Sequence, residues 1–203
     1  FLTEFAREHI LTKINIEIKS IVIPHGILQQ EHNNYKFQKD NFNILYISDF
    51  LPYKHNLNVV RAISSLINEG HMISLTLIGA IDNRQYPEIN KITTSNPKLQ
   101  NKIKVLGKLE YNEIRKYFNN SSLFLFASTC ENLPFIVLEA ISYGMPIISS
   151  NKSPMKDMIY GKDIFFNSYD FNSIKTTIAN NLESEKLNKM SIENFKLSKK
   201  YLW

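Results

Sequence analysis

Cysteine is nearly absent from this chain of 203 residues, which contains only Cys130. A single cysteine rules out an intrachain disulfide and suits a reducing compartment. No apolar run approaches the roughly 20 residues that cross a bilayer. Charged residues (Glu4, Arg7 and Glu8) also interrupt the first segment, where an export signal would need apolar ones. We therefore expect a cytoplasmic protein, and a peripheral position on the inner face of the membrane stays open.

Residue groups that bind metal ions are missing as well. The sequence has no Asp-x-Asp pair and no group of His or Cys at ligand spacing, so we expect no metal cofactor. The net charge of +5 would suit nucleic acid, anionic lipid or a phosphorylated ligand. The basic residues are spread along the chain, which favours a solvated surface and no nucleic-acid partner. A lipid-surface role is left open for the lysine-rich end, which contains Lys196, Lys199 and Lys200.

Strand-like and helix-like segments alternate along most of the chain. Short apolar runs predict strands at 43–47, 73–78, 102–106, 123–127, 146–149 and 163–166. Helices are predicted at 56–69, 111–119, 134–143 and 171–182, and within the polar segment 82–95, which Asn96-Pro97 closes. A polar helix is predicted at 185–202.

Strands without clean alternation, separated by helices, indicate a parallel sheet covered on both faces. We therefore predict an α/β fold, a doubly wound, Rossmann-like parallel sheet, over residues 41–182, with a C-terminal helix at 183–203. Ligands of such sheets bind outside the carboxyl ends of the strands. The loops of interest thus follow Ile47, Ile78, Leu106, Ala127 and Ser149.

The beginning of the chain has a different pattern. An extended FLTEF stretch, a short helix and the segment SIVIPHGI make up residues 1–28, and a polar segment at 29–40 resembles a linker. We interpret residues 1–28 as the incomplete end of another domain, because the chain also begins with Phe1 and not with Met.

Two carboxylates surround the turn after the fourth predicted strand. Glu131 precedes a helix whose first amides are unsatisfied donors at the positive end of a dipole, and such an end favours a phosphate. Glu139 lies in that helix and leans toward its N-terminus, where it could accept hydrogen bonds from ligand hydroxyls. The alternative is that Glu131 only favours the dipole and Glu139 is merely exposed.

The stretch ENLPFIVLEAISYGMPII, residues 131–148, resembles the E-x7-E region of the retaining glycosyltransferases of family 4, which have the GT-B fold. VIPHGI (22–27) resembles the I-P-N-G-V segment that ends the N-terminal domain of that family. ILYISDFLPYKHNLNVVRAI (44–63) resembles its G-R-L-x-P-x-K-G strand and loop. VLGKLEYNEIRKYFNNSSLFLFAS (105–128) resembles its V-x-F-L-G-x-V…P-S segment. The resemblance covers nearly the whole chain, in the order of the family.

The resemblance implies a role for each matching residue. Glu131 and Lys54 would be the catalytic residues: Glu131 contacts the donor sugar, and Lys54 neutralises the departing diphosphate. Glu139 would hold the ribose. The turn that meets the diphosphate would include Asn132 and the amides of Leu133, Pro134 and Phe135, and the remaining donor-site residues are Ser128 near the phosphate and Leu106 and Gly107 beside the nucleobase.

The sugar–diphosphate chemistry fits these residue types. Cleavage puts negative charge on the leaving group, which a lysine and a helix N-terminus stabilise, and positive character on the anomeric carbon, which a carboxylate stabilises. The sequence departs from the family at Ser48-Asp49, which replaces the usual G-R, and at His55, which replaces the glycine of K-G. A further departure is the turn Asn132-Leu133-Pro134, in place of a G-F-G type.

We therefore expect the donor-binding half of a retaining, hexosyltransferase-type GT-B enzyme, without its acceptor domain and inactive alone. The enzyme would pass a sugar from a nucleoside diphosphate-sugar to a saccharide or lipid-linked acceptor, in cell-surface polysaccharide or glycolipid synthesis. The alternatives are a GT-B nucleotide-sugar epimerase and a non-catalytic nucleotide-binding module, for which the loss of the arginine at Asp49 is the evidence.

Overall fold

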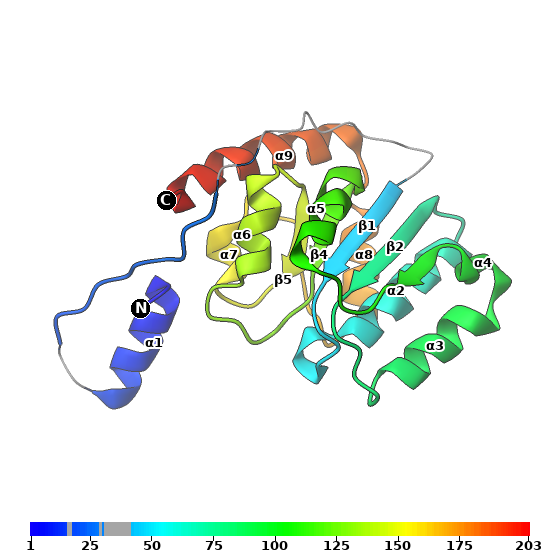
Figure 1. Cartoon of the computed structure of the whole chain (residues 1–203), viewed down its shortest axis with the longest axis horizontal. Helices are drawn as coiled ribbons and strands as arrows, with labels where there is room; N and C mark the ends of the chain where they lie inside the picture. The colour runs from blue at the N-terminus through cyan, green and yellow to red at the C-terminus, as the bar shows by residue number, and fades with distance from the viewer. Residues whose placement is uncertain (16–17, 29, 31–41) are drawn as a thin grey trace.

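The computed structural model describes residues 1–15, 18–28, 30 and 42–203 (Figure 1). Apart from Gln30, the predicted linker at 29–40 lies outside the described residues. A helical segment and an extended stretch form the beginning of the chain. An α/β domain follows from Phe42 onward.

A parallel sheet of six strands forms the centre of this domain, in the order β3-β2-β1-β4-β5-β6. The strand order reverses between β1 and β4, which is the switch point where ligands of open α/β sheets bind. The strands are apolar on both faces because helices cover both. Their bounds are β1 Phe42–Ile47, β2 Ile73–Ile78, β3 Ile103–Val105, β4 Leu123–Phe126, β5 Ile147–Ser150 and β6 Phe165–Phe166.

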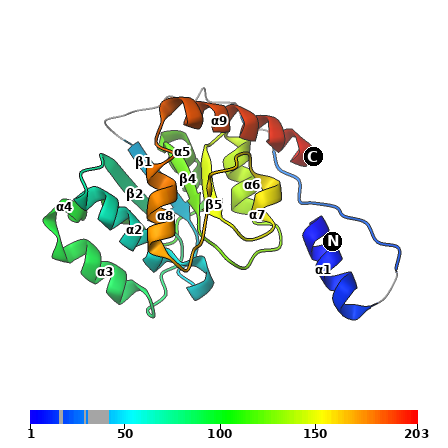
Figure 2. The same cartoon turned by 180° about the vertical axis from the view of Figure 1, so that it is seen from behind.

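Helices lie on both faces of the sheet, as Figures 1 and 2 show from opposite sides. One face carries α2 (Asn56–Asn68), α3 (Tyr86–Ser95), α4 (Pro97–Gln100) and α8 (Phe171–Ala179), which pack around α2. The other carries α5 (Tyr111–Asn120), α6 (Phe135–Ser142) and α9 (Ser184–Ser198), with α6 packed against α9. The predicted doubly wound parallel sheet is confirmed.

Most predicted elements are present with small shifts at their ends. The last helix is shorter than predicted, because α9 passes into a 3-10 turn, η2 (Lys199–Tyr201). The sequence did not predict the short helix α7 (Met155–Met158). The expected extended FLTEF stretch was wrong: α1 (Glu4–Ile14) begins inside it, because the Thr3 hydroxyl accepts a hydrogen bond from the Ala6 amide at 3.1 Å and caps the helix.

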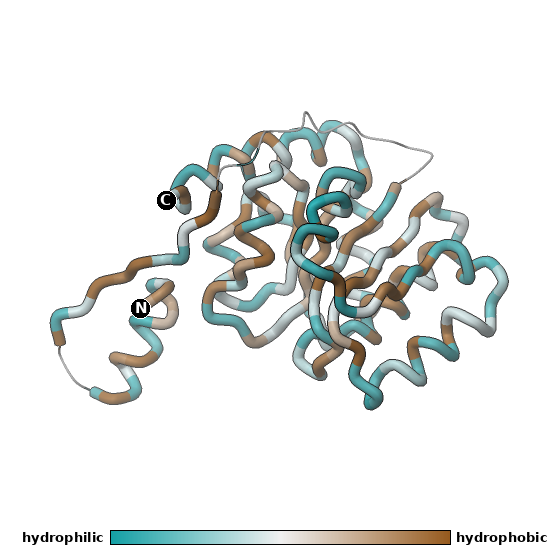
Figure 3. The backbone as a smooth tube through the Cα atoms, in the orientation of Figure 1, coloured by the Kyte–Doolittle hydropathy of each residue, from teal (hydrophilic) through white to brown (hydrophobic). Residues whose placement is uncertain are grey.

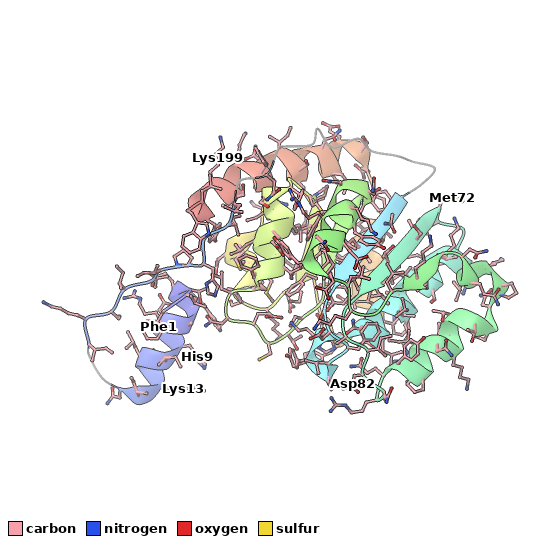
Figure 4. All side chains as sticks on the ribbon, in the orientation of Figure 1. Phe1, His9, Lys13, Met72, Asp82 and Lys199 are labelled. Atoms are coloured by element: carbon pink, nitrogen blue, oxygen red, sulfur yellow. The ribbon has the colours of Figure 1, made fainter. Side chains whose placement is uncertain are left out.

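Within residues 1–15 and 18–28, the side chains are exposed or half-buried apart from that of Ile27. Helix α1 has no buried residue, and the side chains of Ile21 and Ile23 are exposed. Figure 3 shows hydrophobic residues both in the central strands and along this outer stretch. Figure 4 shows His9 and Lys13 on α1 and Phe1 just before it, away from the sheet. At the end of the stretch, the Ile27 amide donates to Tyr201 O at 2.7 Å, so the segment is joined to the end of the chain.

Candidate active site

The loops at the carboxyl edge of the sheet are held together by their backbones. The Ser48 amide donates to Ile78 O at 2.8 Å, and the Gly79 amide donates to Gly107 O at 2.9 Å. A Cβ atom at Gly79 would lie 2.1 Å from Ser48 O, so only glycine fits there. In Figure 4, Met72 and Asp82, just before and just after β2, mark the opposite edges of the sheet. Backbone hydrogen bonds thus join the loops that follow β1, β2 and β3 at the carboxyl edge.

Lys54 ends the 3-10 turn η1 (Pro52–Lys54), which follows β1. The Lys54 carbonyl accepts a hydrogen bond from the Tyr46 hydroxyl at 2.5 Å, and Tyr46 is itself fully buried in β1. His55 follows with φ 55° and ψ 30°, the left-handed conformation that glycine usually supplies. The backbone around Lys54 therefore keeps a glycine-like turn although a histidine stands there.

Glu131 lies in the loop between β4 and α6, and its carboxylate forms an ion pair with the Lys54 ammonium. The two side chains are only 16% (Lys54) and 14% (Glu131) exposed. The Lys54 ammonium also lies 5.6 Å from the centre of the Phe126 ring, at the end of β4. The structure thus brings the two predicted catalytic residues together at the switch point.

The N-terminus of α6 is the helix end nearest to Glu131 in sequence. The amides of Val137 and Leu138 both donate to Pro134 O, so the amides before them precede the first helical hydrogen bonds. Pro134 has no amide hydrogen, so of the three predicted amides of Leu133, Pro134 and Phe135 only the first and the last can donate. Among the turn side chains, Leu133 and Pro134 are buried, whereas Asn132 and Phe135 are exposed.

Ser128 lies just beyond β4 and is fully buried. Its carbonyl accepts a hydrogen bond from the Ser150 hydroxyl at 2.5 Å, and its own hydroxyl has no partner among the described residues. Leu106 and Gly107 follow β3, two strands away from β1, and their backbones bond to Leu77 O at 3.0 Å and to the Gly79 amide at 2.9 Å. For Ser128, Leu106 and Gly107, the donor-binding roles stay predictions.

Glu139 is buried, with 8% of its surface exposed, so the alternative of a merely exposed glutamate is wrong. Burial raises the pKa of its carboxyl above the usual value, and a hydrogen bond from the Tyr111 hydroxyl opposes that rise. The same contact, with burial, raises the pKa of Tyr111 to about 12. Glu139, Tyr111, Phe135 and Trp203 line a cavity of about 240 Å³ beside α6.

Asp49, which stands where the resemblance implies an arginine, has a local structural contact. Its carboxylate accepts a hydrogen bond from the Ala80 amide at 2.8 Å, while the Phe50 amide donates to Ala80 O at 2.9 Å. The carboxylate therefore satisfies a backbone donor in the loop after β2. Two contacts of the site were missed by sequence reasoning: the Tyr111 hydroxyl on Glu139, and Thr129, whose hydroxyl lies 3.1 Å from His55 Nε2.

Within the part of the chain that the structure describes, no three His, Cys, Asp or Glu side chains gather as a metal site. In the same residues, no helix has the length and hydrophobicity that a bilayer crossing requires. At the carboxyl edge of the sheet, the protein places the Lys54 ammonium and the positive end of the α6 dipole.

Comparison with protein families matches residues 29–197 to "Glycosyl transferases group 1". The chain belongs to this family. Among curated group 1 relatives, the capsular polysaccharide biosynthesis glycosyltransferase CapH of Staphylococcus aureus is 30% identical over 152 residues, which are 74% of this chain and 41% of CapH. CapM of the same species is 24% identical over 199 residues, 93% of this chain and 50% of CapM. The chain thus spans half or less of these relatives.

Solved structures of glycosyltransferases share the fold of this chain, at sequence identities of 16–18%. A glycosyltransferase from Rickettsia africae superposes with a TM-score of 0.81, at 18% identity, over 99% of this chain and 58% of that chain. The pneumococcal O-GlcNAc transferase GtfA, solved with UDP and GlcNAc, has a TM-score of 0.76 at 16% identity, over 98% of this chain and 41% of that chain. The predicted resemblance to GT-B glycosyltransferases is confirmed at the level of the group 1 family and of the fold, while family 4 and the retaining mechanism stay predictions.

Proposed function

We propose that this chain is the nucleotide-sugar-binding part of a retaining glycosyltransferase that acts in capsular or other cell-surface polysaccharide synthesis. The observation that carries the proposal is the meeting of Lys54 and Glu131 at the switch point, ahead of a helix that also bears the buried Glu139. The names of the relatives CapH and CapM support the polysaccharide assignment, and GtfA with UDP supports a uridine nucleotide. The acceptor is a saccharide or a lipid-linked saccharide, bound with a further N-terminal domain.

Each group has one role in this proposal. A donor diphosphate at the N-terminus of α6 draws the Lys54 ammonium toward the leaving oxygens, where it balances the charge that develops as the glycosidic bond breaks. Glu131 is then free of its partner and faces the sugar, where a carboxylate stabilises positive character on the anomeric carbon. Glu139 accepts hydrogen bonds from the ribose hydroxyls in the cavity beside α6. No metal is required, because the protein supplies the positive charge.

Calorimetric titration with UDP-sugars and GDP-sugars tests the donor site directly. Hydrogen bonds to charged groups contribute about 2 kcal/mol, so we expect Lys54→Ala to weaken binding about 30-fold and Glu139→Ala about tenfold. Lys98→Ala and Glu185→Ala, at exposed positions on other surfaces, are the matched controls. Absence of nucleotide binding by the wild type, or wild-type affinity in both site variants, would refute the assignment.

A nucleotide-sugar epimerase is the second candidate, because it would share the sheet and the diphosphate site. Product analysis with a labelled donor separates the two reactions. A transferase yields free nucleoside diphosphate and a glycosylated acceptor, whereas an epimerase returns an isomerised sugar. A non-catalytic module would bind nucleotide and give neither product. The pairing of Lys54 with Glu131 favours the transferase, since it joins a leaving-group cation to a carboxylate at the reacting centre.

A further inference from the structure

His55 has a backbone conformation that its residue type rarely adopts. Its φ of 55° lies in the left-handed region, and within residues 1–15, 18–28, 30 and 42–203 the one other non-glycine residue with positive φ is Asn15, at the end of α1. An unfavourable conformation persists when surrounding contacts compensate for it, and such positions gather at functional sites. The contacts of the His55 side chain therefore indicate what the histidine adds to a turn for which glycine would suffice.

The imidazole of His55 contacts the loop that leads to Glu131. Its Nε2 atom lies 3.1 Å from the Thr129 hydroxyl oxygen. The Thr129 amide and hydroxyl donate to Tyr53 O at 2.9 and 3.3 Å. The tautomer of the imidazole decides which of the two groups donates in the contact between Nε2 and the Thr129 hydroxyl. The imidazole also makes an edge-to-face contact with the Tyr169 ring, with the two ring centroids 4.7 Å apart.

These bonds surround the ion pair of the site. Tyr53 and His55 are the two neighbours of Lys54 in the chain, and Thr129 stands two residues before Glu131. We propose that His55 is a positioning residue, which joins the Lys54 loop to the Glu131 loop through Thr129 and so sets where the lysine ammonium stands when a nucleoside diphosphate binds. The link to nucleotide binding rests on the proposed function, whereas the bridge between the loops does not.

Burial lowers the pKa of His55, so the imidazole is neutral near pH 7. A neutral ring brings no second positive charge next to Lys54. The contact of His55 with Thr129 therefore affects the position of the Lys54 ammonium and adds no charge to the site. Loss of this contact should weaken nucleotide binding only while Lys54 is present.

Hydrogen exchange on the chain itself tests the bridge without any ligand. His55→Gly removes the ring but tolerates positive φ, and Thr129→Val removes only the hydroxyl. Relative to its intrinsic exchange rate, we expect the amide of residue 129 to exchange about fivefold faster in His55→Gly, as for the loss of one hydrogen bond, and at least that much faster in Thr129→Val. The double variant should exchange no faster than Thr129→Val, because that substitution already removes the contact with His55 together with the hydroxyl bond to Tyr53 O. Thr129→Ser should match the wild type, and the Leu75 amide of β2 should not change.

If the amide of residue 129 exchanged at the wild-type rate in both single variants, the proposed link between the two loops would be wrong. A calorimetric titration with UDP and with GDP then tests its consequence. We expect His55→Gly and Thr129→Val to bind about fivefold more weakly than the wild type, and His55→Gly to cause no further loss in a Lys54→Ala background. An equal loss in that background would show that His55 acts on the fold and not on Lys54. If the wild type bound neither nucleotide, the proposed function would fail, while the exchange data would still decide the bridge.

Discussion

The two glutamates of the site differ in how their charge is balanced. Glu131 faces the ammonium of Lys54, and both side chains are largely shielded from water. Glu139 is more deeply buried, but the partner at its carboxylate is a neutral hydroxyl, that of Tyr111. The two carboxylates are eight positions apart in sequence, yet one is held in an ion pair, whereas the other has no cation as partner within the described residues.

This difference agrees with the two ligand groups that the site is proposed to receive. A diphosphate is anionic, so a lysine can leave one carboxylate for another anion without losing a partner. Ribose hydroxyls are neutral donors, and a carboxylate that lacks a cation has unused acceptor positions for them. The Glu131 carboxylate therefore has an ionic partner before the donor binds, whereas the Glu139 carboxylate keeps unused acceptor positions for the ribose. Three substitutions can break or sharpen this contrast.

The largest effect is expected from Lys54→Met, which leaves the shielded Glu131 carboxylate without its cation. Removing one partner of a buried ion pair typically costs 3–5 kcal/mol, so we expect a loss of about 3 kcal/mol in the free energy of unfolding. Replacing both partners, Lys54→Met with Glu131→Leu, should restore most of it. Urea denaturation at pH 7 measures both. A double variant no more stable than Lys54→Met would contradict the balanced-pair description.

An effect of the opposite sign is expected from Glu139→Gln, which removes a buried carboxylate whose observed partner is the neutral Tyr111 hydroxyl. The folded protein holds the Glu139 proton more tightly than the unfolded chain does, because its pKa is raised above 4.5. The contribution of this group to stability is therefore present at low pH and is lost as pH rises through 4.5 toward the raised pKa. We expect Glu139→Gln to gain stability relative to the wild type over that range. Urea denaturation at a series of pH values tests this, and a difference that stays constant with pH would refute it.

The smallest effect is expected from Tyr111→Phe. The tyrosine is 62% exposed, so the loss of its hydroxyl should cost less than about 1 kcal/mol at pH 7. Because that hydroxyl lowers the pKa of Glu139, its removal should move the pH dependence described for Glu139 further upward. The same substitution in a Glu139→Gln background should leave the pH dependence unchanged. An equal shift in both backgrounds would show that Tyr111 acts on some other group.

Much of the sheet could be predicted from the sequence, because local signals and tertiary structure agree there. The run Leu123–Phe126 is short, apolar and followed by a turn and a helix, so β4 and α6 were located to within a residue or two. The meeting of Lys54 with Glu131 also follows from a parallel sheet, whose strands all deliver their loops to one edge. These parts depend on periodicity and on chain direction, both of which a sequence contains.

Other features depend on contacts that no local pattern contains. Helix α7 has four residues, too few for a helical period to appear. The partner of Glu139 is a tyrosine that the fold brings from the start of α5, and nothing around Tyr111 in the sequence marks it. One missed feature did have a signal: Thr3 followed by Glu4 is typical of a helix N-terminus, and α1 begins there.

The position of Trp203 has a practical consequence for all of these experiments. It is the one tryptophan of the sequence, it is 88% exposed, and its indole lies against Gly26, where an added Cβ would meet the ring at 2.4 Å. The ring lines the same cavity as Glu139 and Phe135. Trp203 is thus an intrinsic fluorophore at the cavity. A ligand that covers its indole shifts the tryptophan fluorescence to shorter wavelength, and in this sequence that signal comes from Trp203 alone.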